Sequence, residues 1–243
     1  MSTQPGPGPA PSAEDTALLA AVYPQASWPP FDPTRSALLV IDLQRLCIDP
    51  QRGMFEAAAR LGRPDLLEPY RRRVEEVVVP HAADLAAAFR AAGRPVIFTK
   101  IESRLPSGED RSPCHRALDL TVTPGAVEGE FLPALVPAAG DVVLAKTASD
   151  AFVGTGLDEL LRNAGITHLA VVGVLSHECV ESTTRHAADL GYTVQVVEDA
   201  CGAVEHDRHE MAMRDLGQSY AVVTSTAVLR RRLEADPPAA GHG

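Results

Sequence analysis

The sequence predicts an α/β fold, specifically a three-layer α/β/α sandwich around a six-stranded, mostly parallel sheet. Two observations support this prediction. Six short apolar runs recur along the chain, and helical stretches separate most of them. The runs are continuously apolar, which is typical of parallel strands buried on both faces. Right-handed crossovers between such strands place helices on both sides of the sheet.

The expected elements follow one another in a regular order. The expected strands are 36–43, 94–100, 141–146, 167–174, 192–199 and 220–225. The expected helices are 71–93, 156–165, 178–191, 206–217 and 226–235, and the first three end at a glycine, a common helix C-cap. Segment 101–140 is rich in Pro, Gly and Ser, which indicates a long loop.

The chain has 243 residues, of which 45% are hydrophobic, so it can bury one sizeable core. We expect a single domain over residues 17–234. Residues 1–16 and 235–243 are rich in Pro, Gly and other small residues, and we predict disordered tails at both ends.

Composition argues against several classes of function. The net charge of −10 disfavours a nucleic-acid partner, and no apolar run reaches the roughly 18 residues of a membrane span. The N-terminus lacks a secretion signal, so a cytoplasmic location is expected. The four cysteines are scattered, which disfavours disulfides and a zinc site. We find no HExxH, GxGxxG or Walker pattern, and we expect no metal and no cofactor.

Several reactive side chains follow the predicted strands. In folds of this kind, functional groups lie at the carboxyl ends of the strands. Asp42 ends the first strand, Lys100 the second and Lys146 the third, and the acidic pair 198–199 ends the fifth. The fourth strand leads through a short turn to Cys179 at the start of a helix. One sheet edge therefore collects a carboxylate, ammonium groups and a thiol.

The chain contains only two lysines, Lys100 and Lys146, and both fall at predicted strand ends. Arginine supplies the positive charge elsewhere, although Lys is the more compact point charge. This usage favours a site that needs an ammonium group. A salt bridge to Asp42 without catalytic meaning is the alternative.

Cys179 is the candidate nucleophile. It lies near a helix N-terminus, where the helix dipole favours the thiolate, and Gly173 allows a sharp turn before it. The alternative is a buried packing thiol, which is what most free cysteines are. We interpret Cys47, Cys114 and Cys201 as structural or incidental.

Further substrate contacts are predicted around the same edge. His177 stands two residues before Cys179, where the two side chains diverge, so a substrate contact or a solvated turn residue is favoured over a catalytic base. Lys100, Glu102 and Arg104 begin the loop 100–116 and could bind a polar or anionic substrate. The alternative is that these are ordinary loop surface residues.

Three blocks of sequence resemble the isochorismatase-like cysteine hydrolases. They are "ALLVIDLQ", "DVVLAKTASDAFVGTGLDELLRNAGITHLAVVGV" and "CVESTTRHAADLGYTVQVVEDA", in the family's order. The resemblance covers roughly residues 36–229. It implies a catalytic triad of Asp42, Lys146 and Cys179. The family's lysine precedes a small-residue–Phe segment, matched here by "KTASDAF" with Phe152, which we also count among the substrate contacts.

The resemblance also implies details of the site. It implies a cis peptide between Val174 and Leu175, and an oxyanion hole formed by the backbone N–H groups of Leu175 and Cys179. The nicotinamidases of this family bind a metal through an Asp-x-His element and a further His. Here Gln51 stands where such a His is expected, which argues against both a metal and nicotinamide as the substrate. The resemblance further implies a homodimer or homotetramer that acts on a small molecule.

The retained thiol implies hydrolysis of a C–N bond through a thioester, with release of ammonia or an amine. The nearest motifs are those of ureidoacrylate, biuret and carbamoyl-amide hydrolases, so the expected substrate is a linear amide, ureido or carbamoyl compound. The turn "LSHE" before Cys179 departs from those relatives, and Leu175, His177 and Glu178 are expected to reshape the pocket mouth.

Two other functions compete with amide hydrolysis. One is vinyl-ether hydrolysis of the isochorismatase type, which would not need Cys179. The other is a non-catalytic binding or assembly module, which slow alkylation of Cys179 near neutral pH would favour.

Overall fold

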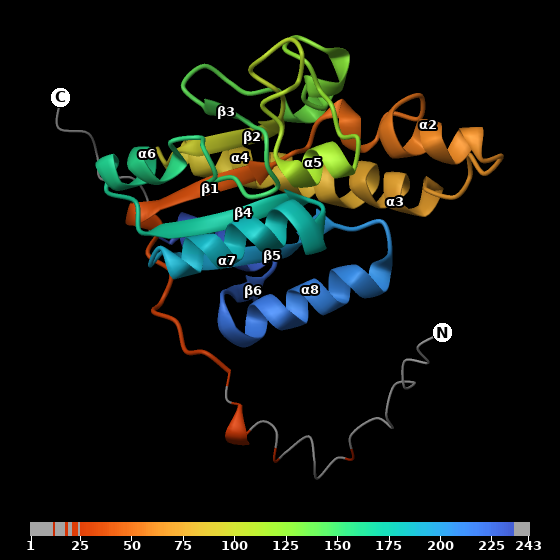
Figure 1. The fold of residues 1–243 in the computed structure, drawn as a ribbon. Coiled ribbons are helices and arrows are strands. Elements are labelled where there is room, and N and C mark those ends of the chain that lie inside the picture. The colour runs from red at the N-terminus through yellow and green to blue at the C-terminus, as the bar shows by residue number, and fades with distance from the viewer. Residues whose placement is uncertain (1–11, 13–17, 19–20, 24, 236–243) are drawn as a thin grey trace.

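The structure is a computed structural model that describes residues 12, 18, 21–23 and 25–235 (Figure 1). The predicted tails, 1–16 and 235–243, lie outside the described residues except for Ser12 and Ala235. Their disorder therefore stays a prediction. No helix among the described residues is both long and apolar enough to cross a membrane.

The six predicted strands form one fully parallel sheet, and the predicted fold class is confirmed. The strands are β1 (Ser36–Ile41), β2 (Val96–Ile101), β3 (Val142–Lys146), β4 (His168–Val174), β5 (Thr193–Gly202) and β6 (Val222–Thr224). Their order in the sheet is β3-β2-β1-β4-β5-β6. β1 and β4 form the centre, and β1 is buried throughout, as its unbroken apolar sequence predicts.

The α-helices occur mainly where the sequence predicts them. They are α2 (Gly53–Arg60), α3 (Glu68–Arg73), α4 (Val79–Ala91), α5 (Pro113–Ala117), α6 (Leu157–Asn163), α7 (Glu181–Asp189), α8 (His206–Ser219) and α9 (Thr226–Glu234). Short 3₁₀ turns are η1 (Pro33–Arg35), η2 (Arg45–Cys47), η4 (Val127–Gly129) and η5 (Pro133–Leu135). Two π-helical turns, η3 (Val74–Val78) and η6 (Ser176–Val180), interrupt or begin longer helices. The helix predicted at 71–93 therefore starts earlier and contains a π turn.

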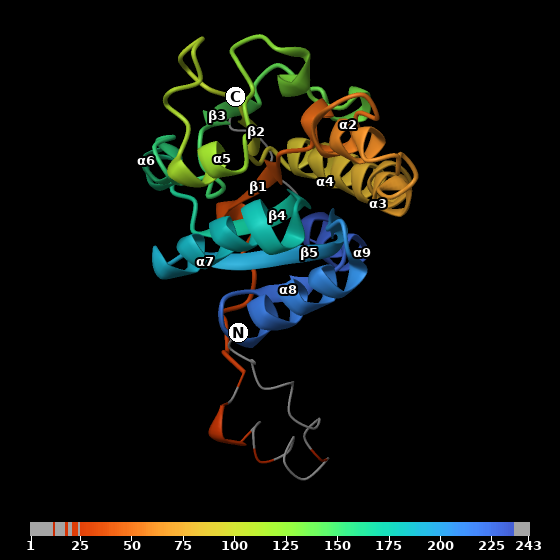
Figure 2. The same cartoon turned by 45° about the vertical axis from the view of Figure 1, so that its right-hand side comes forward.

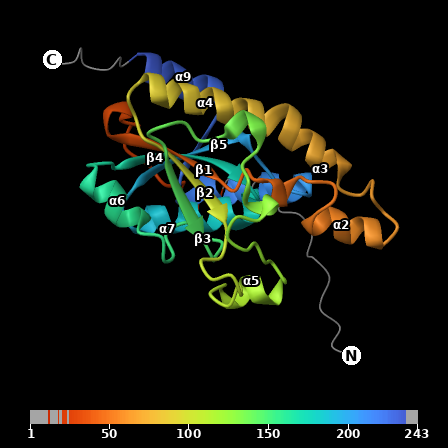
Figure 3. The ribbon, with the colours of Figure 1, turned by 90° about the horizontal axis from the view of Figure 1, so that it is seen from above.

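The helices form two layers around the sheet. α4 and α9 cover one face, and α6 and α7 cover the other (Figure 3). Figure 2 shows α7 and α8 side by side on this second face. The loop-rich segment between β2 and β3 carries α5 and extends beyond the sheet next to these strands (Figure 3). Each apolar face is thus covered, as the three-layer prediction requires.

β5 is longer than predicted, and the acidic pair at 198–199 does not end it. The strand continues to Gly202 after a register shift opposite β4 between Val171 and Gly173. Asp199 Oδ1 accepts hydrogen bonds from the backbone N–H and the hydroxyl of Thr226, at 2.8 and 2.9 Å, and so caps α9. This carboxylate stabilises a helix N-terminus.

The strand order places a switch point between β1 and β4. The chain moves outward from β1 through β2 to β3, then returns to the other side of β1 as β4. Ligands in open parallel sheets bind outside the carboxyl ends of the strands at such a point. Asp42 directly follows β1, and Cys179 lies in the turn after β4, so both residues flank the switch point.

Candidate active site

Asp42, Lys146 and Cys179 meet at the carboxyl edge of the sheet. Lys146 Nζ lies 2.7 Å from Asp42 Oδ2 and 3.4 Å from Cys179 Sγ. Lys146 and Asp42 have exposed fractions of 0% and 1%, and Cys179 has 5%. Lys146 ends β3, Asp42 directly follows β1, and Cys179 lies in the turn after β4, so only folding brings the three side chains together.

Asp42 is held by its neighbours as β1 ends. Its φ of 53° is left-handed, a conformation that Asp tolerates better than most residues, and the chain turns sharply there. Thr99 Oγ1, on the adjacent strand β2, donates a hydrogen bond to Asp42 Oδ1 at 3.0 Å. One carboxylate oxygen therefore faces the Thr99 hydroxyl and the other faces the Lys146 ammonium.

The Lys146 ammonium is surrounded by polar partners. Besides its contacts with Asp42 and Cys179, it donates to the carbonyl oxygens of Ala148 and Ser149 at 3.0 and 2.9 Å. Burial lowers the pKa of Lys146, but Asp42 and Cys179 outweigh this effect, and its pKa is raised. The ammonium therefore stays charged and compensates the buried carboxylate.

Cys179 lies in the π turn η6, and α7 follows directly. π turns occur frequently at functional sites. The peptide bond between Val174 and Leu175, at which the resemblance places a cis bond, is cis.

The thiol of Cys179 is protonated at neutral pH, contrary to the expectation that the helix start favours a thiolate. Burial, followed by the negative charge of Asp42, raises its pKa to about 12, although the Lys146 ammonium opposes this shift. The nucleophile would therefore need a base at the moment of attack. The candidate for this base is the carboxylate of Asp42, which contacts the same Lys146 ammonium as the thiol.

A pocket of about 800 Å³ opens onto these groups. Asp42, Cys179 and the turn residues Leu175 and His177 line it, and so does the second thiol of the site, Cys47. Cys47 Sγ donates to the Asp42 carbonyl oxygen at 3.0 Å, so this cysteine also braces the turn after β1. The volume is typical of a site for a small molecule.

The other predicted contacts do not line this pocket. Lys100 Nζ pairs with Glu102 at 2.7 Å, because successive residues of a strand face opposite sides and Thr99 faces Asp42. Arg104 donates from Nη2 to the Gly154 carbonyl oxygen. Of the five predicted contacts, only His177 lies at the pocket.

Phe152 packs away from the pocket. Its ring stacks on Tyr192 with centroids 6.0 Å apart and contacts the ring of His186. Only 8% of the residue is exposed, so its role is to anchor the segment after Lys146 in the core. Phe152, which matches the phenylalanine of the family's segment, is therefore a core-packing residue in this structure.

Sequence reasoning missed a buried pair, Ser176 and His209, behind the Cys179 turn. His209 Nδ1 lies 2.8 Å from Ser176 Oγ, and Arg73 Nη2 lies 3.4 Å from His209 Nε2. Arg can only donate, so Nε2 accepts and the neutral ring carries its proton on Nδ1, which donates to Ser176. Burial, followed by the charges of Arg73 and His206, lowers the pKa of His209 to about 4.

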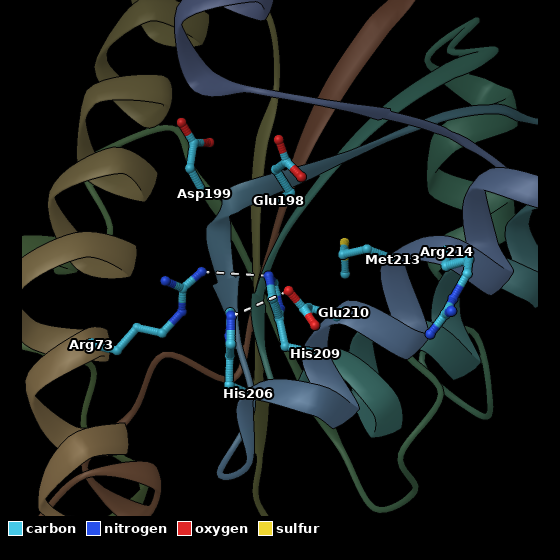
Figure 4. Close-up of a pocket in the computed structure, with 8 residues that line it drawn as sticks. All are labelled: Arg73, Glu198, Asp199, His206, His209, Glu210, Met213 and Arg214. Carbon is cyan, nitrogen blue, oxygen red and sulfur yellow. Dashed lines mark hydrogen bonds and ion pairs between the residues drawn. The ribbon is translucent and has the colours of Figure 1, made fainter.

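His209 and Arg73 also line a second pocket, of about 550 Å³, between α3, β5 and α8. Figure 4 shows Arg73 on α3 extending towards His209 on α8, with Glu198 and Asp199 on β5 nearby. His206 is paired with Glu210 there at 3.4 Å. Nothing in the local sequence around Ser176 or His209 indicates that these two side chains meet. The residues are far apart in the chain, and only folding brings them together.

The described residues contain no group of three or more His, Cys, Asp or Glu side chains arranged to hold a metal ion.

Known proteins identify the family. The isochorismatase domain matches residues 36–228, which is most of the chain. The chain belongs to the isochorismatase family. An isochorismatase family protein from Burkholderia thailandensis is 32% identical, with a TM-score of 0.61, and the alignment covers 86% of this chain and 100% of that one.

Two further structures of the family's fold are similar. A cysteine hydrolase from Pseudomonas syringae pv. phaseolicola 1448A has a TM-score of 0.73 at 24% identity, covering 87% of this chain and 98% of that one. An N-carbamoylsarcosine amidase from Thermoplasma acidophilum has a TM-score of 0.60 at 27% identity, covering 79% and 96%. This isochorismatase family member is thus a hydrolase by family, and the fold predicted from sequence is that of its relatives.

Proposed function

We propose that the protein is a cysteine-dependent amidohydrolase that cleaves the C–N bond of a small linear amide, ureido or carbamoyl compound. The observation that carries this proposal is the contact of one buried ammonium, Lys146 Nζ, with both Asp42 and Cys179. The carboxylate and the thiol line one pocket, and the ammonium is buried behind them in contact with both. Together they provide a base, a fixed positive charge and a nucleophile.

The first step forms a thioester. The Asp42 carboxylate takes the proton of the Cys179 thiol, and Sγ attacks the substrate carbonyl carbon to form a C–S bond. Lys146 remains charged and stabilises the thiolate as it develops. Negative charge moves to the carbonyl oxygen, and the N–H groups of Leu175 and Cys179 are the proposed donors to it.

The second half of the reaction releases the products. The tetrahedral intermediate collapses, the C–N bond breaks, and Asp42 returns the proton to the departing nitrogen. Water then attacks the thioester and loses a proton to Asp42. The C–S bond breaks, and Asp42 passes the proton back to Sγ, which restores the thiol and the carboxylate.

The similarity to an N-carbamoylsarcosine amidase supports C–N hydrolysis over ether hydrolysis. A base, a cation and a protonated buried thiol within contact distance also suit a reaction in which the thiol attacks. Vinyl-ether hydrolysis would leave Cys179 without a chemical role.

The test measures ammonia or amine release from ureido acids, carbamoyl amino acids, biuret, simple primary amides and nicotinamide, with a chelator present. Wild type and Cys179→Ala are compared. Loss of activity of about 10,000-fold or more in the variant would support the proposal. Ammonia or amine release that survives in Cys179→Ala would contradict the role of the thiol as nucleophile. Release from none of these compounds would favour ether hydrolysis. Isochorismate would then be the next substrate, and its cleavage should survive in Cys179→Ala but not in Asp42→Ala.

A further inference from the structure

One part of the wall of the active-site pocket is apolar. Its lining includes Leu46, Met54, Ile101, Leu120, Leu175 and Val204. A pocket of about 800 Å³ is far larger than an amide group alone requires, so most of this volume faces the substituent of the substrate. Apolar walls favour an apolar substituent of several carbon atoms, because each buried methylene contributes to binding.

The charged groups at this pocket are predominantly acidic. Besides Asp42, whose charge Lys146 compensates, five carboxylates line it, against two guanidinium groups. The carboxylates belong to Glu56, Asp119, Glu128, Glu178 and Glu205, and the guanidinium groups to Arg60 and Arg208. Arg52 and Arg111, which do not line the pocket, pair with Glu128 and Asp119 from outside it. Among the described residues, Glu178 is thus the one carboxylate of these five with no arginine partner.

Both arginines are already paired. Arg60 Nη2 lies 2.8 Å from Glu56 Oε1, and Arg208 Nε lies 2.9 Å from Glu205 Oε2. The Lys146 ammonium is enclosed by Asp42, Cys179 and two carbonyl oxygens. Among the described residues that line the pocket, no Lys or Arg lacks an acidic partner, so the charge of each arginine is already partly compensated before a substrate binds.

Glu178 brings an acidic group next to the nucleophile. It precedes Cys179 in the turn, and its carboxylate lies 3.8 Å from His177 Nε2, beyond hydrogen-bond distance. Its side chain is 48% exposed, so it keeps contact with solvent at the pocket mouth. A carboxylate on the substrate would be repelled here and would also lose hydration against the apolar walls.

The basic residues expected to bind an anion face elsewhere. Lys100 is paired with Glu102, and Arg104 is bonded to the Gly154 carbonyl oxygen. Neither lines the pocket.

We propose that the substrate is a neutral or cationic amide with an apolar substituent, and that amides bearing a carboxylate are discriminated against. The expected order of reaction rates rests on the proposed amide hydrolysis. The expected order of binding affinities depends on the pocket alone and not on the reaction. This selectivity excludes ureido acids and carbamoyl amino acids, which carry a carboxylate, from the candidate substrates.

The experiment compares four primary amides: acetamide, hexanamide, 6-aminohexanamide and the monoamide of adipic acid. At low salt and pH 7, we expect kcat/KM for hexanamide and the cationic amide to exceed that for the anionic amide by roughly tenfold or more. The penalty for the anion should shrink as salt is added. Hexanamide should also exceed acetamide by roughly 100-fold if all four additional methylenes are buried. An anionic amide that reacts as well as hexanamide at low salt would overturn the proposal.

Variants assign the discrimination to Glu178. Glu178→Gln should improve the relative kcat/KM of the anionic amide roughly fivefold, because one nearby negative charge is removed. Glu210→Gln removes an equal charge at the second pocket and should leave the ratio unchanged. An unchanged ratio in Glu178→Gln would remove this residue as the source of the discrimination.

Binding separates this inference from the proposed function. The same amides are titrated into Cys179→Ala by calorimetry. Preferential binding of hexanamide and the cationic amide would uphold the pocket selectivity even if wild type released no ammonia, an outcome that would defeat only the proposed function. Binding of the anion as tight as that of hexanamide, or no binding by any of the four, would overturn the selectivity.

Discussion

A side chain at Gly173 would collide with the main chain of Ile41. A Cβ built on Gly173 would lie 2.0 Å from the Ile41 carbonyl oxygen, and the φ of Gly173 is 127°. These two residues are partners across β1 and β4. Asp42 comes directly after Ile41, and the turn that carries Cys179 begins just after Gly173. Close contact between the two strands therefore keeps the carboxylate and the thiol at one site.

Gly173→Ala should reduce the free energy of unfolding by more than about 3 kcal/mol, because the clash is with backbone and cannot be relieved by a side-chain rotation. Gly191→Ala is the matched control, since its φ of 92° is also unfavourable for alanine but no atom lies within 4 Å of the new methyl. That control should cost about 1 kcal/mol. Urea denaturation measures both, and equal losses would contradict the steric explanation.

Lys146→Met should destabilise the protein by about 3–5 kcal/mol, because it leaves the carboxylate of Asp42 buried without its cation. Adding Asp42→Asn should restore part of this stability, since the uncompensated charge is then gone. Amide hydrolysis should remain lost in both proteins. Thermal denaturation and ammonia release are measured in parallel. A double variant less stable than Lys146→Met would show that the ion pair is not the cause.

Cys179 should be alkylated slowly by iodoacetamide at pH 7, since its pKa is raised to about 12 and its side chain is buried. The exposed Cys114 should react first and serves as the internal reference. The rate at Cys179 should keep rising between pH 7 and 10, as the thiolate fraction grows. Peptide mapping by mass spectrometry follows each site. Faster alkylation of Cys179 than of Cys114 at pH 7 would contradict the raised pKa.

From the sequence alone, slow alkylation of Cys179 would favour a non-catalytic module. The raised pKa of this thiol removes that argument, because a catalytic Cys179 is also expected to react slowly. A thiol that is deprotonated by Asp42 only during attack can be catalytic and still react slowly with a reagent that the base does not assist.

Stability should fall as the pH falls from about 6.5 to about 4, because His209 stays neutral in the folded state while the histidine of the unfolded chain becomes protonated. Above this window, both states are neutral and the effect is absent. We expect His209 to account for a loss of about 2 kcal/mol. Urea denaturation at pH 4.5 and 7 measures it.

His209→Gln should flatten this dependence, at the cost of lower stability at pH 7. His206→Gln, on the same helix with an exposed ring, should keep it. A pH dependence that is unchanged in His209→Gln would assign the effect to other groups.

Local sequence was sufficient for the strands, most of the helices and the residues of the contact between Asp42, Lys146 and Cys179. Asp42 and Lys146 follow buried apolar runs, and parallel strands bring their ends to one edge. Phe152 and Lys100 could not be placed in this way. Whether a residue after a strand faces the pocket or the core depends on the pleat and on the helix packed above it.

The sequence by itself determined the parallel sheet and its edge of reactive groups, because periodicity and strand-end position are local properties of the chain. The family was indicated by the resemblance of three sequence blocks. Only the tertiary structure decided the protonated state of Cys179, the pairing of Arg60 and Arg208, and the contact between His209 and Ser176. These depend on burial and on distances between segments far apart in the chain. A pKa or a pocket's charge balance is set by everything that packs around a group, and the neighbouring residues in sequence are a small part of that environment.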